Sequence, residues 1–348
     1  MNHLYIQTAF LGDLLLAVPS LRQIRQWSPS AKLTLVCRKG YGDFFNQLQL
    51  VDEIIEVTKK AKVQLATNQL KDRKFSTIFC PHQSTSSMRL VKALKAEQKI
   101  GFKKVMDWGV FDKKVARNLT WPEAMRQMQL VAEVDESTKI KLEAFAEKPH
   151  AIPDWADMKL NQLSWDRKHL QKIVSKKITG NHDLGDYICI APGSVWPTKR
   201  WTQKSFEKVI TLLARENMKV VIIGAPDERQ LCEKIQSNTP NSFSFAGHLS
   251  VEESLVMMSY AKGLICNDSG AMHMASLLKL PTISIFGPTV VELGYKPWNP
   301  NAYVFSNQDL LCRPCGQHGG KSCPIGTHQC MESISAKEVV EKALVMFR

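Results

Sequence analysis

Three stretches of the sequence place carboxylate, hydroxyl and basic side chains where a strand should give way to a helix. They are TAFLGDLLLAVPSL from residue 8, APGSVWPTKRW from residue 191 and CNDSGAMHMAS from residue 266. In open α/β sheets, ligands bind beyond the carboxyl ends of the strands, which is where such junctions lie. We therefore expect these stretches to build a binding or catalytic site.

The first stretch offers a single carboxylate after a glycine. Gly12 permits a tight turn after the first expected strand, and Asp13 then stands at or near the start of a helix. One interpretation is that Asp13 only caps the helix by accepting a backbone N–H bond. The other is that its carboxylate acts as a general base on a substrate hydroxyl, which requires hydrogen-bond reach to that group. The residues alone leave both open.

The second stretch suits an anionic ligand. Ahead of an expected helix it combines Gly193 and Ser194 with Thr198, Lys199 and Arg200. Exposed backbone amides, small hydroxyl groups and two adjacent cations suit a diphosphate, and a helix N-terminus adds a favourable dipole. The alternative is an ordinary Lys–Arg pair on a solvated surface. The place of the pair ahead of a helix favours the ligand site.

The third stretch joins a helix start to a histidine. Asp268 or Ser269 can cap the helix, and Gly270 lets a ligand approach the backbone amides of the first turn. His273 lies one turn further and should point back over the helix start, the alternative being a core histidine. Two amide-rich helix starts and the lysine of the second stretch could neutralise a leaving diphosphate. We therefore expect no metal and no other cofactor.

The elements that must position these residues can be read from apolar periodicity. Short apolar runs alternate with helix-like stretches through the first half, which is typical of βαβ units and a mainly parallel sheet. A helix is expected from Asp13 to Trp27, kinked or delayed by Pro19. The expected strands read HLYIQT, KLTLVC, VDEIIEV and FSTIFC.

The pattern weakens from about residue 143 to residue 186, where polar sequence with Trp155 and Trp165 offers no clear strand. We expect the connection between two domains there, since the length also suggests two. The sequence thus predicts an α/β protein of two doubly wound, Rossmann-like domains, 1–165 and 166–334, facing across a cleft. A last helix is expected over Ala336–Met346, within residues 335–348. In the second domain, strands are expected at 187–193, 219–226, 243–246, 263–268 and 282–288, and helices at 202–216, 227–237, 251–261 and 270–278.

Composition limits the kinds of partner. The chain has 348 residues, a net charge of +13 and a pI near 9.3, which favours phosphorylated sugars, nucleic acid or an anionic bilayer surface. The basic residues are spread out, without a basic helix or aromatic–basic interleaving, so we do not expect nucleic-acid binding. Neither a GxxxxGK[ST] loop nor a GxGxxG turn is present, which argues against a P-loop NTPase and a Rossmann dehydrogenase.

A cytoplasmic location is expected. The apolar runs are far shorter than the ~20 residues of a membrane-spanning helix. The first residues lack a basic leader and carry Asp13 within their apolar stretch, which is unlike a signal peptide.

Four of the nine cysteines, with two histidines among them, gather near the end of the sequence. Their CxxC-x7-C-x6-C spacing is compatible with structural zinc, which takes four Cys or mixed Cys/His ligands. A thiol-packed or disulfide-closed loop is the alternative, and the odd total argues against an obligatory disulfide framework. The sequence leaves these possibilities open. The residues are Cys312, Cys315, His318, Cys323, His328 and Cys330.

The three stretches, in this order and at this spacing, resemble the lipopolysaccharide heptosyltransferases of glycosyltransferase family 9, which have the GT-B fold. FLGDLLLAVPSLRQIR is similar to that family's N-terminal GD…PAL element, and PGSVWPTKRW is similar to its PG…KRW loop. NDSGAMHMASLLKLPTISIFGPT is similar to its DSG…H…A…P…FGPT segment over 23 residues. The cysteine-rich tail and the helix after it resemble members like heptosyltransferase II.

The resemblance implies an inverting transfer of heptose from ADP-heptose to a hydroxyl of the phosphorylated, lipid-anchored inner core of lipopolysaccharide. It implies an acceptor-binding N-terminal domain, a donor-binding second domain and a last helix that crosses back to the N-terminal domain. Asp13 matches the catalytic carboxylate, with Gly12 beside it on the acceptor side. Either Asp227 or Glu228 should contact the donor, and Glu228 is our candidate. The other donor-binding positions match Ser194, Lys199, Asp268, Ser269, Gly270 and His273.

Two further expectations follow from the resemblance. Catalysis needs no metal, and the lipid-anchored acceptor together with the positive charge implies peripheral attachment to the anionic inner face of the cytoplasmic membrane. The alternative is an enzyme of the same fold that uses a different nucleotide sugar, either another glycosyltransferase or an epimerase.

Overall fold

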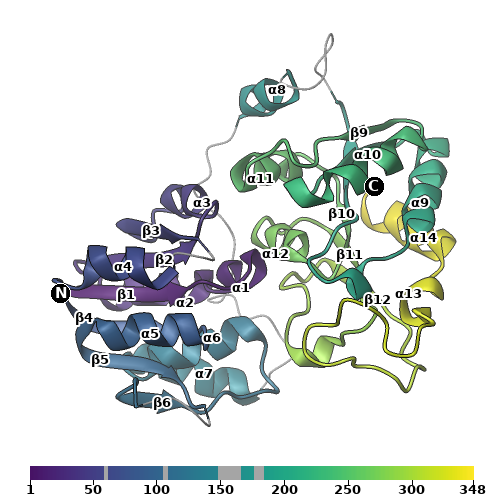
Figure 1. The fold of residues 1–348 in the computed structure, drawn as a ribbon. Coiled ribbons are helices and arrows are strands. Elements are labelled where there is room, and N and C mark those ends of the chain that lie inside the picture. Colours follow the sequence, from purple (N-terminus) through teal and green to yellow (C-terminus); the bar gives the residue numbers. More distant parts are fainter. Residues whose placement is uncertain (59–61, 105–108, 148–165, 176–183) are drawn as a thin grey trace. The chain divides into compact units, whose positions relative to one another are not determined.

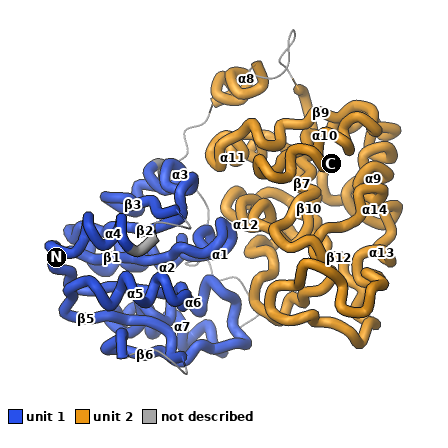
Figure 2. Tube along the Cα trace, in the orientation of Figure 1, with its two compact units in different colours: residues 1–158 blue, residues 159–348 orange. Residues whose placement is uncertain are grey.

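The computed structural model describes the chain except for residues 59–61, 105–108, 148–165 and 176–183 (Figure 1). The chain divides into two compact units, Met1–Met158 and Lys159–Arg348, which we call unit 1 and unit 2 (Figure 2). The boundary expected after residue 165, and both tryptophans of the expected connection, fall on the segment 148–165, which lies outside the described residues.

Unit 1 contains a six-stranded parallel sheet in the order β3-β2-β1-β4-β5-β6. This is the strand order of a Rossmann sheet, which changes direction between its first and fourth strands. The sequence did not predict β5 and β6, because β5 begins with the polar and half-exposed run KAEQK. The strands are β1 (Asn2–Gln7), β2 (Lys32–Arg38), β3 (Glu53–Val57), β4 (Lys74–Cys80), β5 (Lys95–Phe102) and β6 (Lys113–Val115).

The helix expected from Asp13 to Trp27 is two helices. Pro19 lies in the first turn of the second one, where a missing N–H costs no hydrogen bond, so the predicted interruption at Pro19 is confirmed. The tight turn predicted at Gly12 is wrong, because the first helix begins at Leu11 and includes Gly12. The helices of unit 1 are α1 (Leu11–Leu15), α2 (Val18–Trp27), α3 (Gly42–Gln47), α4 (Lys62–Leu70), α5 (Thr85–Ala93), α6 (Glu123–Ala132) and α7 (Glu136–Glu147).

Unit 2 repeats the same architecture with a parallel sheet in the order β12-β11-β10-β7-β8-β9. Numbered from β7, this is again the Rossmann order, and the change of direction lies between β7 and β10. The prediction of two doubly wound parallel sheets is therefore confirmed, although β12 was not foreseen. The strands are β7 (Tyr187–Ala191), β8 (Lys219–Ile222), β9 (Ser242–Ser244), β10 (Leu264–Asn267), β11 (Thr282–Ile285) and β12 (Ala302–Phe305).

The helices predicted at 202–216, 227–237, 251–261 and 270–278 are confirmed with shifts of one or two residues at their ends, whereas the helices at 167–175 and 329–332 were not predicted. In the described part of unit 2, short 3-10 helices lie at loop positions: η2 (Pro197–Lys199), η3 (Pro226–Glu228) and η4 (Val291–Leu293). The α-helices are α8 (Arg167–Ser175), α9 (Gln203–Arg215), α10 (Arg229–Ser237), α11 (Val251–Ser259), α12 (Gly270–Leu277), α13 (Gln329–Glu332) and α14 (Ala336–Met346).

The last helix, α14, has the predicted bounds but not the predicted destination. We expected it to cross back to the N-terminal domain, whereas it belongs to unit 2 and packs against α9 (Figure 1). Val339 and Ala343 are buried in the core of unit 2, and the ring of Phe347 occupies the space that a side chain at Gly263 would need. Val339 and Ala343 lie on the apolar face of α14, and its burial holds the helix against the core of unit 2.

Within the described parts of the chain, no helix combines the length and apolarity that spanning a membrane requires.

Candidate active site

The loops after β7 and β10 meet at the switch point of the unit 2 sheet. Because the sheet changes direction between these two strands, the loops that follow them diverge and leave room for a ligand at the carboxyl edge. The second and third predicted stretches are these two loops. The topology therefore brings together the residues that the sequence had singled out in two separate places.

A buried ion pair joins the two loops. Lys199 Nζ lies 2.6 Å from Asp268 Oδ2, and the two side chains are only 11% and 6% exposed. The hydroxyl of Thr289 donates to the same carboxylate oxygen at 2.7 Å. Charges this deeply buried are tolerated when they are paired and hydrogen-bonded. An ammonium carries three N–H donors and this pair uses one, so Lys199 can also bind an anion.

Asn267 anchors the loop after β7 to the end of β10. Its side chain is fully buried, and its amide nitrogen donates to the carbonyls of Pro192 at 2.7 Å and Gly193 at 3.3 Å. Its amide oxygen accepts the N–H of Trp201 at 3.0 Å. One side chain thus fixes both ends of the loop that carries Lys199. The sequence did not predict this role, although an asparagine at the end of a buried strand is a usable signal.

The start of α12 is not capped by a side chain. Ser269 occupies the N-cap position with extended backbone but makes no side-chain capping bond, and the Asp268 carboxylate is engaged by Lys199. The prediction that either side chain caps this helix is therefore wrong. Ser194 adds a further contact between the two loops, because its hydroxyl donates to the Asp268 carbonyl at 3.3 Å. The backbone amides of the first turn of α12, from Gly270 onward, therefore lie close to the buried ammonium of Lys199.

His273 is buried in α12 close to this ion pair. Burial lowers the pKa of His273 from 6.5 to about 4; the nearby charge of Lys199 acts in the same direction and that of Asp268 opposes it. The imidazole is therefore neutral at physiological pH. Its Nδ1 is buried and has no hydrogen-bond partner among the described residues. A buried polar atom in this state is rare in folded proteins, which makes His273 a candidate ligand contact.

Glu228, and not Asp227, faces the loop after β7. Its Oε2 accepts the N–H of Ala225 at 2.8 Å, whereas Asp227 is exposed. A side chain added at Gly193 would place its Cβ 2.0 Å from the Glu228 carboxyl carbon, so the carboxylate rests on the backbone of this loop. Burial raises the pKa of Glu228, while the nearby Arg200 guanidinium opposes that rise.

Asp13 lies in unit 1, in the first turn of α1 and on the carboxyl side of β1. It is the third helical residue and the cap position is Phe10, so Asp13 is not the N-cap that one interpretation expected. The Gln127 amide donates to the Asp13 carbonyl at 3.1 Å, and Gln127 in turn accepts the Tyr5 hydroxyl at 3.0 Å. These buried groups hold the short helix, and with it the half-buried Asp13, in place.

No disulfide closes the cysteine-rich segment, all of whose cysteines lie in the described part of the chain. All of its thiols are free, with Cys330 buried and Cys312 exposed. Within the described residues, no group of three or more potential ligands is arranged to hold a metal ion.

The sequence of residues 65–323 matches the profile of glycosyltransferase family 9 (heptosyltransferase). The chain belongs to glycosyltransferase family 9. Lipooligosaccharide heptosyltransferase 2 of Campylobacter jejuni is 25% identical over 345 residues, which cover 96% of this chain and 94% of the relative. The resemblance inferred from the three stretches is therefore confirmed, and the protein is a glycosyltransferase.

Solved structures share the fold of this family 9 glycosyltransferase. E. coli ADP-heptose LPS heptosyltransferase II has a TM-score of 0.79 at 18% identity, covering 100% of this chain and 98% of its own. E. coli heptosyltransferase WaaC with ADP has a TM-score of 0.72 at 18% identity, covering 99% of this chain and 100% of its own. The predicted GT-B fold is confirmed.

Proposed function

We propose that this family 9 glycosyltransferase transfers heptose from ADP-heptose to a hydroxyl of the lipopolysaccharide inner core. The observation that carries the proposal is the buried pair of Lys199 and Asp268 beside the uncapped start of α12. A cation next to helix-start amides is the environment that a nucleotide diphosphate requires. The relatives support the sugar and the acceptor, since they are named lipooligosaccharide or lipopolysaccharide heptosyltransferases, and one solved structure holds ADP.

The donor would bind at the switch point of unit 2. Lys199 and the amides from Ser269 onward stabilise the charge that grows on the diphosphate as the bond to the anomeric carbon breaks. Neutral His273 offers its unpartnered Nδ1 to the donor, and Glu228 contacts the sugar or ribose. Asp268 holds the ammonium of Lys199 in place rather than capping the helix.

Asp13 would act as the general base. Its carboxylate takes the proton from the acceptor hydroxyl while that oxygen attacks the anomeric carbon from the face opposite ADP. The new glycosidic bond forms as the bond to the diphosphate breaks, so the configuration inverts in one step. Gly12 lies beside Asp13 on the acceptor side of the reaction.

A donor screen tests the proposal. Purified protein is mixed with an inner-core acceptor and a panel of nucleotide sugars, and nucleotide release is measured with and without acceptor. We expect acceptor-dependent release of ADP from ADP-heptose. Release from a different nucleotide sugar alone would contradict the donor, and turnover without acceptor would favour an epimerase, an alternative that the family does not favour.

We also propose that the protein works at the inner face of the cytoplasmic membrane, attached peripherally. A net charge of +13 attracts the chain to anionic headgroups, and the proposed acceptor is lipid-anchored. Nucleic acid is not a proposed partner.

A further inference from the structure

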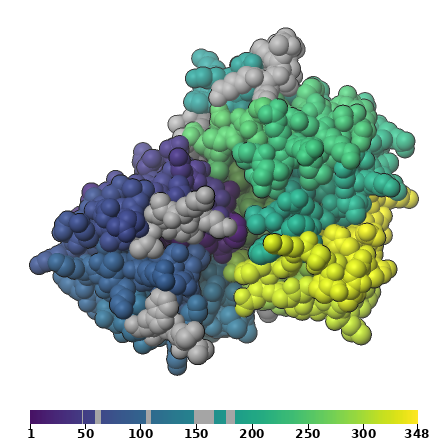
Figure 3. Space-filling view, in the orientation of Figure 1, coloured from purple at the N-terminus to yellow at the C-terminus, as the bar shows by residue number. Residues whose placement is uncertain are grey.

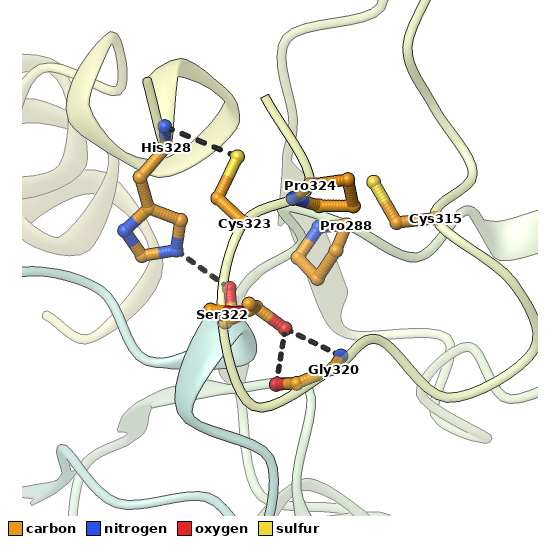
Figure 4. Close-up of a pocket in the computed structure, with 8 residues that line it drawn as sticks. Pro288, Cys315, Gly320, Ser322, Cys323, Pro324 and His328 are labelled. Atoms are coloured by element: carbon orange, nitrogen blue, oxygen red, sulfur yellow. Dashed lines mark hydrogen bonds between the residues drawn. The ribbon is translucent and has the colours of Figure 1, made fainter. Parts of the chain in front are cut away.

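The cysteine-rich segment docks on the loop that carries Lys199. The contact encloses a pocket lined by residues of the segment 315–328, by Pro288 and by Thr198, the residue that directly precedes Lys199. Figure 4 labels the lining residues of the segment, among them Gly320 and His328. On the face seen in Figure 3, the C-terminal part of unit 2, in yellow, borders the teal part that contains this loop. Neither the family's three sequence stretches nor the proposed reaction gives this segment a task.

Thr198 is held from one side by Gly320. The threonine hydroxyl donates to the Gly320 carbonyl at 2.9 Å and accepts the Gly320 N–H at 2.8 Å, and the Thr198 N–H donates to the same carbonyl at 3.3 Å. The neighbouring Gly319 has a φ of +73°, and a Cβ there would lie 2.8 Å from the threonine hydroxyl. Thr198 is only 5% exposed. Its backbone and side chain are therefore both fixed by this segment.

His328 holds Thr198 from the other side. Its Nε2 lies 2.7 Å from the Thr198 carbonyl oxygen, and because a carbonyl only accepts, Nε2 carries the proton. The backbone N–H of His328 donates to Cys323 Sγ at 3.4 Å, which ties the histidine to the same segment. Thr198 thus has its hydroxyl, N–H and carbonyl all bound, one residue before the lysine that pairs with Asp268.

We propose that Thr198 and His328 are positioning residues for Lys199, and that residues 315–328 set the affinity of the site for the donor diphosphate. The ion pair fixes the end of the Lys199 side chain, while the contacts of Thr198 fix the backbone from which that side chain extends. Losing them lets the ammonium move away from the start of α12. The inference rests on the proposed donor site and adds the groups that shape it.

The test compares ADP affinity, measured by titration calorimetry, in His328→Ala and His328→Gln. Both variants place a residue with a Cβ at the φ of +48° that His328 adopts, so they share the backbone strain of this position, but only glutamine keeps a side-chain N–H to donate to the Thr198 carbonyl. We expect His328→Ala to weaken ADP binding up to about tenfold, the value of one lost hydrogen bond, and His328→Gln to recover most of it. Gln317→Ala, at an exposed position of the same segment, is the control and should match wild type.

A double-mutant cycle with Lys199→Ala separates positioning from general destabilisation. If His328 acts through Lys199, then His328→Ala should have almost no further effect on ADP affinity once the lysine is gone. Equal effects in both backgrounds would overturn the inference, as would ADP affinity in His328→Ala equal to that of the Gln317→Ala control. Thr198→Val, which removes the hydroxyl bonds, should behave like His328→Ala. Wild-type protein that neither binds ADP nor uses ADP-heptose would overturn the proposed function and this inference together.

Discussion

Asp13 and Lys199 carry the two opposite tasks of the proposed reaction, because one must accept a proton while the other must stabilise a growing negative charge. The two side chains differ in burial in a way that suits these tasks. Asp13 is half-buried at the start of a short helix, whereas Lys199 is almost completely buried against Asp268. The proposed base is therefore only partly buried, while the proposed anion-binding cation is held in a fixed place.

Replacing Asp13 by asparagine should remove catalysis but leave donor binding. Asparagine keeps the size of the side chain and cannot take the acceptor proton, so we expect kcat to fall about 100- to 10,000-fold with unchanged ADP affinity. Turnover by ADP release and affinity by calorimetry check this. Asp43→Asn, which changes an exposed carboxylate in the first turn of α3, should leave both unaltered. Wild-type turnover in Asp13→Asn would refute the general-base role.

Stability should depend on pH through His273. Its folded-state pKa lies near 4 and its ordinary value is 6.5, so the unfolded chain binds more protons between these limits. The free energy of unfolding therefore falls as the pH drops through this window, by about 2 kcal/mol between pH 7 and pH 5. Denaturant unfolding at both pH values should show a smaller loss in His273→Gln, which cannot titrate. Identical losses in the two proteins would contradict the assignment.

At the scale of elements, the loop after β7 and the start of α12 depend on each other. Asn267 provides three buried hydrogen bonds between them. Its replacement by alanine leaves the Trp201 N–H and the Pro192 carbonyl unpaired, which should lower the free energy of unfolding by about 3 kcal/mol. Urea denaturation measures the loss. Asn238→Ala, which removes one exposed hydrogen bond to Glu207, is the matched control and should cost far less.

The helix start and Lys199 should also make a metal unnecessary for turnover. Together they supply the positive charge that a divalent cation would otherwise bring to a diphosphate. Treatment with EDTA should therefore leave the rate of ADP release unchanged. Loss of activity on chelation and its return with Mg²⁺ would show that the protein groups alone do not suffice.

For the whole molecule, the net charge of +13 predicts salt-sensitive attachment to anionic bilayers. The Debye length shortens from about 10 Å at 0.1 M salt to about 3 Å at 1 M, so attraction to the headgroups should weaken over that range. Sedimentation with vesicles that contain anionic lipid should show binding at low salt and release at high salt. Vesicles of zwitterionic lipid alone are the control. Binding that does not respond to salt would contradict peripheral electrostatic attachment.

Much of the molecule could be read from sequence because its pattern is local. Continuous apolar runs such as those of β7 and β10 are buried on both faces, which marks them as strands of a covered parallel sheet. The prediction failed where that signal is absent. β5 was missed because it begins with polar residues. The helix α14 was predicted, but its amphipathic pattern does not identify the surface against which it packs. An apolar face shows that a helix packs against another part of the protein, but it does not identify that part.

The sequence by itself determined the family, the two doubly wound sheets and the residue types of the proposed donor site. The tertiary structure decided how those residues are used. Asp268 binds Lys199 instead of capping α12, Glu228 faces the loop where Asp227 is exposed, and Asn267 and His328 hold the loop that carries Lys199 through contacts that the sequence did not predict. Hydrogen bonds and ion pairs form between residues far apart in the chain, so their partners are fixed only when the strands are placed side by side.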